Sequence, residues 1–309
     1  MRLIPFVQKL DSVYFPLMEI ETDLTTLPAT KRADLHLHSH ESDGRYSPSE
    51  LVHRAADGGL ELIALTDHDT VSGLAAAREA ARERDLYFVN GLELEATLQD
   101  PDGSFFAIHI LGYGMDPTNQ DLLDILTRIR EKRIQRARQI HFHLEKLDII
   151  IPFEKIEDYS EGESLSRVHV AQVLKDFGYV DSMNEAFDRY LGNDRPAYVP
   201  RMGPGPEELI MLIHHAGGHA IWAHPYYTER DEYIEYLVAA GIDGIECSHS
   251  EFSDDITRQY RQIAREYDLF ITGGSDYHGT LEEEFDLGEW WVEIEEVPFE
   301  IAVSPEEGG

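Results

Sequence analysis

The stretch Asp34-Leu35-His36-Leu37-His38-Ser39 lies in an apolar segment that predicts a β-strand over Ala33–Ser39. Successive side chains of a strand point to opposite faces, so His36 and His38 would share one face and Leu35 and Leu37 the other. Such a pair at a strand end suits a divalent metal ion, because borderline ions favour imidazole nitrogen. The pair alone is weak support, since histidines are more often surface residues or hydrogen-bonded core residues.

The chain after this strand alternates between helical stretches and short apolar runs. Ser47, Pro48 and Glu50 predict a helix start, with Ser47 as the cap and Glu50 at capping-box spacing. Further strands are predicted at Leu60–Leu65, Tyr87–Leu94, Phe105–Gly112, His219–Ala223, Gly244–Cys247 and Leu269–Thr272. Later helices are predicted at Glu207–Ala216, Asp231–Ala239 and Asp254–Tyr267. This order favours a parallel α/β sheet or barrel, with reactive groups at the C-terminal ends of the strands.

A mostly helical pattern interrupts this rhythm from about residue 118 to 190, and a loop rich in Gly and Pro follows at 192–206. We therefore predict a barrel built from residues 33–114 and 205–288, with a helical insertion domain at 115–204. Residues 1–32 are predicted to be an N-terminal extension and residues 289–309 a C-terminal tail.

Three further segments place histidines and aspartates near predicted strand ends. They are Thr66-Asp67-His68-Asp69-Thr70, Ala223-His224-Pro225 and Gly273-Gly274-Ser275-Asp276-Tyr277-His278-Gly279. Packed into one core without a metal ion, these side chains would be several buried polar groups that need partners. Their combination therefore points to a metal site. Asp67 and Asp69 could orient the ligands around His68, and capping of the following turn is an equal alternative.

Composition limits the class of protein. The formal net charge of −34, from 26 basic and 60 acidic residues, disfavours stable binding to duplex DNA. Most of this acidity is interpreted as a solubilising surface, because one site uses few carboxylates. No run of about 18 apolar residues predicts a membrane span, and no secretory signal is recognised. The single cysteine, Cys247, excludes an intramolecular disulfide and agrees with a cytoplasmic location.

Over residues 33–279 the order and spacing of these segments resemble the motifs of the PHP (polymerase and histidinol phosphatase) family of metal-dependent phosphoesterases. The chain is most similar to the branch of RNase AM and nucleoside 3′,5′-bisphosphate phosphatases. The pieces that carry this finer resemblance are Gly91-Leu92-Glu93, His109-Ile110-Leu111-Gly112-Tyr113, Ser166-Arg167-Val168-His169, Ala197-Tyr198-Val199-Pro200 and Gly217-Gly218-His219-Ala220. The family fold is a distorted (β/α)7 barrel, here with a helical insertion.

The resemblance implies two or three divalent metal ions per chain. It places His36, His38, Glu93 and Asp276 on a first ion, and Asp43, His68 and His224 on a second. A third ion would be held by Glu93 with His109, His169 and His278. The grouping by ion is less specific than membership of the set. The family branch suggests Mn, and a histidine-rich site leaves Zn and Fe as alternatives.

The resemblance further implies hydrolysis of nucleoside 3′,5′-bisphosphates or of short RNA from its 5′ end, through a hydroxide that the metal ions activate. Arg167 and Arg201, with Arg195 behind them, are candidate phosphate ligands, and ordinary surface charge is the alternative. His249 follows a predicted strand and is a candidate for a catalytic or substrate-binding role. Tyr198 could stack on a base or pack in the core.

Two other functions stay open from the sequence. One is a PHP phosphatase for another small phosphate monoester, such as a histidinol-phosphate-like or sugar-phosphate substrate. The other is a non-catalytic, metal-binding accessory module. The complete set of candidate ligands favours an enzyme over the accessory module.

Overall fold

The computed structural model describes residues 32–100, 102–159, 165–200, 203–279 and 285–293. The predicted N-terminal extension up to residue 31, the tail from residue 294 and Arg201 lie outside the described residues. No helix in the described ranges is long and apolar enough to cross a membrane.

The described strands form one sheet in the order β7-β6-β5-β4-β3-β2-β1-β8. Their bounds are β1 Arg32–Leu37, β2 Leu62–Leu65, β3 Tyr87–Gln99, β4 Phe105–Tyr113, β5 His219–Trp222, β6 Gly244–His249, β7 Phe270–Gly274 and β8 Val292–Glu293. The sheet curls until β7 meets β1, where the His38 amide donates to the Tyr277 carbonyl at 3.0 Å and the Asp276 amide to the His36 carbonyl at 2.9 Å. The predicted distorted α/β barrel is thereby confirmed.

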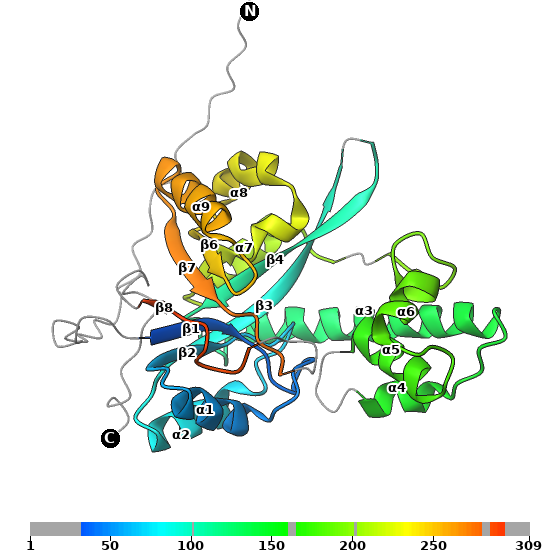
Figure 1. Ribbon diagram of the computed structural model, residues 1–309. Helices are drawn as coiled ribbons and strands as arrows, with labels where there is room; N and C mark the ends of the chain where they lie inside the picture. Colours follow the sequence, from blue (N-terminus) through cyan, green and yellow to red (C-terminus); the bar gives the residue numbers. More distant parts are fainter. Residues whose placement is uncertain (1–31, 101, 160–164, 201–202, 280–284, 294–309) are drawn as a thin grey trace, which may run out of the picture.

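Two strands, β4 and β8, depart from the prediction of a parallel sheet, and β8 pairs antiparallel with β1 inside the predicted C-terminal tail. β4 is antiparallel to both β3 and β5, whereas β1, β2 and β3 are parallel to one another, as are β5, β6 and β7. Only residues 100–104 separate β3 from β4, too few for the crossover that a parallel pair needs. Asp102 and Gly103 are turn residues that could have signalled this hairpin. The hairpin projects from the barrel in Figure 1.

Helices cover the outside of the barrel (Figure 1). Those of the α/β part are α1 Pro48–Asp57, α2 Leu74–Glu83, α7 Pro206–His215, α8 Ile234–Ala240 and α9 Asp254–Glu266, with the 3₁₀ turns η3 Pro225–Thr228 and η4 Asp231–Tyr233. The predicted start of α1 is confirmed, because the Ser47 side chain accepts a hydrogen bond from the Glu50 amide at 3.2 Å.

Apolar side chains form separate cores inside and outside the barrel. Leu35 packs in the inner core with residues such as Val89 and Tyr113, whereas Leu37 packs in the outer core beneath the helices. The two leucines were expected on one face. They lie in different cores because the pairing of β1 with β2 shifts register between Asp34 and Leu37.

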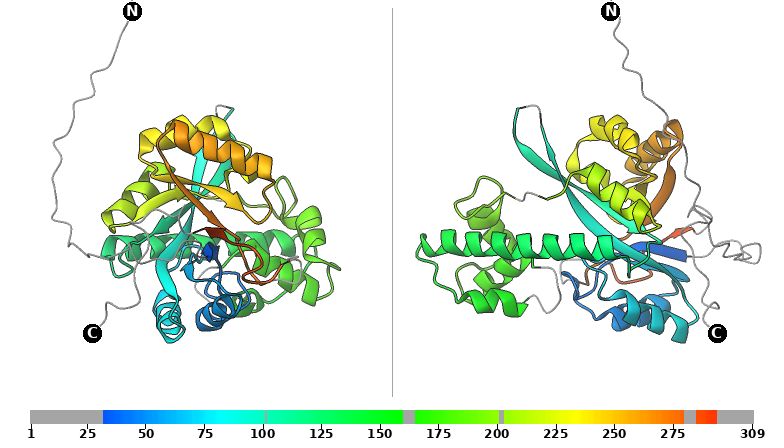
Figure 2. Two further views of the ribbon diagram at one scale, coloured as in Figure 1. Left: turned by 60° about the vertical axis from the view of Figure 1, so that its left-hand side comes forward. Right: turned by 180° about the vertical axis from the view of Figure 1, so that it is seen from behind.

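The middle of the chain is helical and has a core of its own. Its elements are α3 Gln120–Glu145, α4 Phe153–Tyr159, α5 Arg167–Asp176, α6 Met183–Ala186 and the π-helix η2 Phe187–Leu191. The first half of α3, including Leu122 and Ile129, packs on the barrel, and its second half, including Ile140 and Leu144, packs with the smaller helices. Figure 2 shows α3 running from the barrel to these helices. α3 therefore connects the two cores.

Candidate metal centre

Histidine and carboxylate side chains from most of the strands meet at one end of the barrel. β1 supplies His36, with His38 just beyond its end, while Glu93 and His109 lie on the β3–β4 pair. The other candidates follow strand ends: Asp43 after β1, His68 after β2, His224 after β5, and Asp276 and His278 after β7. Parallel strands bring their C-terminal ends to one edge, so residues far apart in sequence can share a site.

The first group of potential ligands coincides with the set predicted for one ion. His36, His38, Glu93 and Asp276 each offer an atom, and these atoms all lie within 4.8 Å of one another. The Asp276 Oδ1 atom is 3.3 Å from His36 Nε2 and 3.0 Å from His38 Nε2. Two imidazoles and two carboxylates at this spacing can hold one divalent ion.

The two remaining groups differ in membership from the prediction. Asp43 and His68 converge with His38 and His278, not with His224. A third group joins His68, Glu93 and His109. The His224 Nε2 atom lies 3.0 Å from Glu93 Oε1 and 3.2 Å from His109 Nδ1, so His224 borders that third group.

His169 stands outside the three groups found in the described residues. Its Nδ1 accepts a hydrogen bond from the Ser166 amide at 3.0 Å, as part of the capping box of α5. The ring also donates a hydrogen bond to the Ser42 backbone, one residue before Asp43. His169 therefore connects α5 to the Asp43 loop, and burial lowers the pKa of its imidazole.

The donor atoms fit bound cations. Buried ligand atoms without a hydrogen-bond partner include His36 Nε2, both ring nitrogens of His38, His68 Nδ1, Asp43 Oδ1, Glu93 Oε2 and His224 Nδ1. A buried polar atom without a partner is costly, and a cation would satisfy several of these atoms at once. The mixture of imidazole and carboxylate suits a borderline divalent ion such as Mn, Fe or Zn.

Glu246, in the middle of β6, is a supporting residue that sequence reasoning missed. Its carboxylate is fully buried, with Oε1 3.1 Å from His36 Nδ1, while Oε2 accepts a hydrogen bond from the His224 amide at 2.7 Å. Although burial opposes the charge, Glu246 and other nearby carboxylates raise the pKa of His36 well above its usual value. The sequence feature that could have identified Glu246 is its position as an acidic residue inside the apolar run Gly244–Cys247.

Two further buried carboxylates hold the loops that carry the ligands. Asp67 accepts hydrogen bonds at 2.7 Å from the Ser39 amide, the Ser39 hydroxyl and the Ser42 hydroxyl, which orders the segment before Asp43. Asp34 accepts from the Ser275 amide at 2.8 Å, next to Asp276. Burial raises the pKa of Asp34 and of Asp67 to about 6. Asp67 thus orders the loop that carries Asp43, and its predicted role in orienting metal ligands stays a prediction.

Asp69 instead joins the site to α3. It accepts a hydrogen bond from Arg133 Nε at 2.6 Å, and both side chains are buried. Sequence reasoning missed Arg133, which occupies an apolar-face position of α3, four residues after Ile129 and four before Ala137. A cation therefore lies beside the loop of His68 in a strongly acidic chain.

The other candidate residues differ in their distance from the centre. His249 is close, because its Nε2 lies 3.8 Å from Asp276 Oδ2 and its Nδ1 accepts from the Glu251 amide at 3.2 Å. Arg167 donates to the Leu191 carbonyl at 3.0 Å, and its guanidinium lies 5.8 Å from the centre of the Tyr198 ring. Tyr198 is thus engaged within the helical segment. Arg195 is exposed.

The last strand residue before the Asp276 loop, Gly274, has no room for a side chain. A Cβ atom there would lie 2.1 Å from the Cβ of His36 and 2.5 Å from its amide nitrogen. We expect Gly274→Ala to destabilise the fold by about 1–3 kcal/mol, the usual cost of overpacking, and to lower the melting temperature by several degrees. Thermal unfolding would measure this shift. Gly205→Ala is the control, since only the flexible Glu207 carboxylate approaches its Cβ closely.

Comparison with known proteins places this geometry in a family. The profile of the PHP domain matches residues 34–274, which contain nearly all of the candidate ligands. The chain belongs to the PHP domain family. This match confirms the predicted family.

Individual PHP proteins are similar to this chain over most of its length. A 3′,5′-nucleoside bisphosphate phosphatase from Chromobacterium violaceum is 37% identical, over 82% of this chain and 90% of its own length. A 5′-3′ exoribonuclease from Haemophilus influenzae is 35% identical, over 86% of this chain and 93% of its own length. A crystal structure described as a metal-dependent phosphoesterase from Bifidobacterium adolescentis has a TM-score of 0.77 and 29% identity, with 87% of this chain and 94% of that chain covered. The predicted class, a hydrolase of phosphoric esters, is confirmed.

Proposed function

We propose that this protein hydrolyses nucleoside 3′,5′-bisphosphates and short RNA from its 5′ end. The observation that carries the proposal is the overlap of the three ligand groups, in which Glu93, His38 and His68 are each shared by two groups. Shared ligands place neighbouring cations close together, as phosphate-ester hydrolysis by clustered metal ions requires. The relatives named as a bisphosphate phosphatase and an exoribonuclease support the nucleotide substrate.

One reaction accounts for both kinds of substrate. Water attacks the 3′-phosphorus and the bond from phosphorus to the 3′-oxygen breaks, so the 3′-oxygen leaves with a proton. A nucleoside 3′,5′-bisphosphate then yields a 5′-monophosphate and inorganic phosphate. RNA yields a 5′-mononucleotide and a shorter chain with a new 5′-phosphate, which can enter the site again.

Different residues of the chain have different roles in this reaction. His36, His38, Asp43, His68, Glu93, His109, His224, Asp276 and His278 would hold the cations, and His169 would position the Asp43 loop. Bound divalent ions supply an acidified water and neutralise charge on the phosphate oxygens. Arg133 pairs with Asp69 and so holds the loop that carries His68.

His249 is placed to donate a hydrogen bond to the substrate. Its Nδ1 accepts a hydrogen bond from the Glu251 amide, so the neutral ring carries its proton on Nε2. That atom is buried, has no hydrogen-bond partner and faces Asp276. We propose that Nε2 donates to a substrate oxygen, whereas Arg167, held by Leu191 and Tyr198, supports the helical segment around α5. The proposed role of Arg201 in binding phosphate concerns a residue outside the described ranges.

The proposal predicts that activity depends on a bound divalent metal. With added Mn²⁺, the purified protein should release phosphate from adenosine 3′,5′-bisphosphate and 5′-mononucleotides from a 5′-phosphorylated oligoribonucleotide. Removal of metal with a chelator should lower both rates by at least about 100-fold, since metal ions stabilise the transition state by several kcal/mol. Re-addition of Mn²⁺, Zn²⁺ or Fe²⁺ in separate assays would identify the ion.

The assay also separates the other functions. Turnover of only histidinol-phosphate-like or sugar-phosphate esters would contradict the nucleotide specificity, and binding of metal without any turnover would indicate an accessory module. We propose Mn as the natural ion on the strength of the family branch. The single cysteine, buried in β6, supports a cytoplasmic location.

A further inference from the structure

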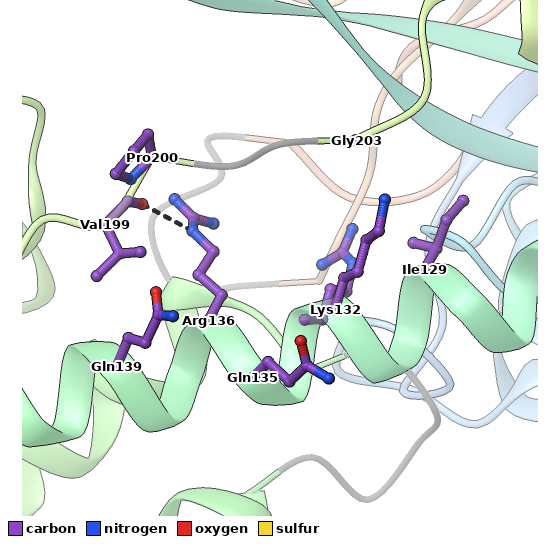
Figure 3. Close-up of a pocket in the computed structure, with 9 residues that line it drawn as sticks. Ile129, Lys132, Gln135, Arg136, Gln139, Val199, Pro200 and Gly203 are labelled. Atoms are coloured by element: carbon purple, nitrogen blue, oxygen red, sulfur yellow. Dashed lines mark hydrogen bonds between the residues drawn. The ribbon is translucent and has the colours of Figure 1, made fainter.

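A cavity of about 420 Å³ opens along α3 on the side facing Val199, Pro200 and Gly203. Polar and cationic side chains of α3 form one wall, and Val199, Pro200 and Gly203 lie on the opposite side (Figure 3). The lining residues are Ile129, Lys132, Arg133, Gln135, Arg136, Gln139, Val199, Pro200 and Gly203. We call this cavity the α3 groove.

The charge of the α3 groove is opposite to that of the protein. Lys132, Arg133 and Arg136 line it, and none of its described lining residues is a carboxylate, although the chain has 60 acidic and only 26 basic residues. Arg133 is paired with Asp69 behind the wall, so Lys132 and Arg136 supply the positive charge. The exposed Lys132 ammonium makes no ion pair with any carboxylate in the described ranges, and it points into the groove in Figure 3. A local cationic surface on so acidic a protein attracts anions specifically to that place.

Contacts at both walls join the α3 groove to the metal centre. Arg133 in one wall binds Asp69, the residue after His68. In the other wall the Gly203 amide donates a hydrogen bond at 2.9 Å to Thr97 Oγ1, on β3 beyond Glu93. The groove therefore lies alongside the ligand cluster rather than on a remote surface.

The shape of the groove suits a linear anion. Ile129 and Gln139 are ten positions apart on α3, which corresponds to about 15 Å of helix. Phosphates of one strand are spaced by about 3.4 Å or more along the axis of a nucleic acid, so this length spans a few nucleotides. Gln135, between the cations, and Gln139, beyond Arg136, offer amide donors and acceptors, which suits ribose hydroxyls as well as phosphates.

We propose that the α3 groove binds the ribose-phosphate backbone of the RNA chain beyond the scissile linkage. This inference rests on the proposed function and specifies its substrate as single-stranded RNA of several nucleotides. After each cleavage the shortened chain carries a new 5′-phosphate, and the groove keeps that chain beside the metal centre for the next cycle. A mononucleotide bisphosphate ends before the groove and gains nothing from it.

The test compares two substrates in the Lys132→Glu variant. We expect the ratio of kcat/KM for a 5′-phosphorylated hexaribonucleotide to that for adenosine 3′,5′-bisphosphate to fall about tenfold, as for the loss of one charge-assisted contact. The salt dependence of hexamer binding should weaken by about 0.7 in logarithmic slope per lost phosphate contact. Lys132→Arg should retain the wild-type ratio.

Lys146→Glu is the matched control, because it makes the same charge change at the exposed C-terminal end of α3. An unchanged substrate ratio in Lys132→Glu, or an equal change in Lys146→Glu, would overturn the groove assignment. Fluorescence anisotropy with a labelled hexamer and chelator-treated protein tests the groove independently of turnover. If the wild-type protein cleaves neither substrate, the proposed function is wrong. If wild type and Lys132→Glu bind the hexamer with equal affinity, the groove assignment is wrong.

Discussion

Replacement of Glu93 by Gln is expected to abolish phosphoesterase activity. The buried Glu93 carboxylate lies 2.9 Å from His68 Nδ1, 2.7 Å from His109 Nδ1 and 3.0 Å from His224 Nε2, and it also approaches His36 and His38. Gln removes the negative charge that two of the three ligand groups share. We expect a loss of at least about 1,000-fold in kcat/KM, because the metal contribution of several kcal/mol is lost and each 1.36 kcal/mol is about tenfold.

Elemental analysis of the same preparation gives a second measurement for Glu93→Gln. The variant should retain fewer metal ions per chain than the wild type. Glu79→Gln serves as the control, since it removes the same charge from an exposed position on α2. Full metal content together with wild-type turnover in Glu93→Gln would show that this carboxylate is not a ligand.

The second large effect is expected from Glu246→Gln. Glu246 acts through other residues, by holding His36 Nδ1 and the His224 amide, and His224 has the unusual backbone angle φ of 26°. Gln presents an amide in place of one carboxylate oxygen, so it cannot satisfy both contacts in the same way. Residues that orient metal ligands typically contribute about 10–100-fold to metal affinity or activity, and we expect a loss in that range.

Metal titration distinguishes positioning from general destabilisation. In Glu246→Gln the dissociation constant for Mn²⁺ should rise, and excess Mn²⁺ should restore part of kcat, while the circular dichroism spectrum stays that of the wild type. Glu235→Gln, at an exposed position of α8, provides the control. Unchanged metal affinity in Glu246→Gln would contradict a role in orienting His36.

Much of the fold was predictable because local patterns report it. Ser47, Pro48 and Glu50 marked the start of α1, and the apolar runs marked the strands to within a few residues. The direction of β4 was not predicted, since an apolar run carries no information about which way its neighbours run. That direction followed from the short connection between Gln99 and Phe105.

The sequence by itself indicated the chemistry of the candidate site, because His36, His38, His68 and Asp276 are recognisable by residue type and by position near strand ends, while Glu93 was identified through the resemblance to the PHP family. Only the tertiary structure decided which atoms meet. In the folded chain Asp43 lies with His278, and His169 lies against the Ser42 backbone. Glu246 contacts His36, which is 210 residues away in the sequence. The physical reason is that a sequence pattern reports periodicity along the chain. The partners of a side chain depend on its direction and on pairing between distant strands, which exist only in the folded barrel.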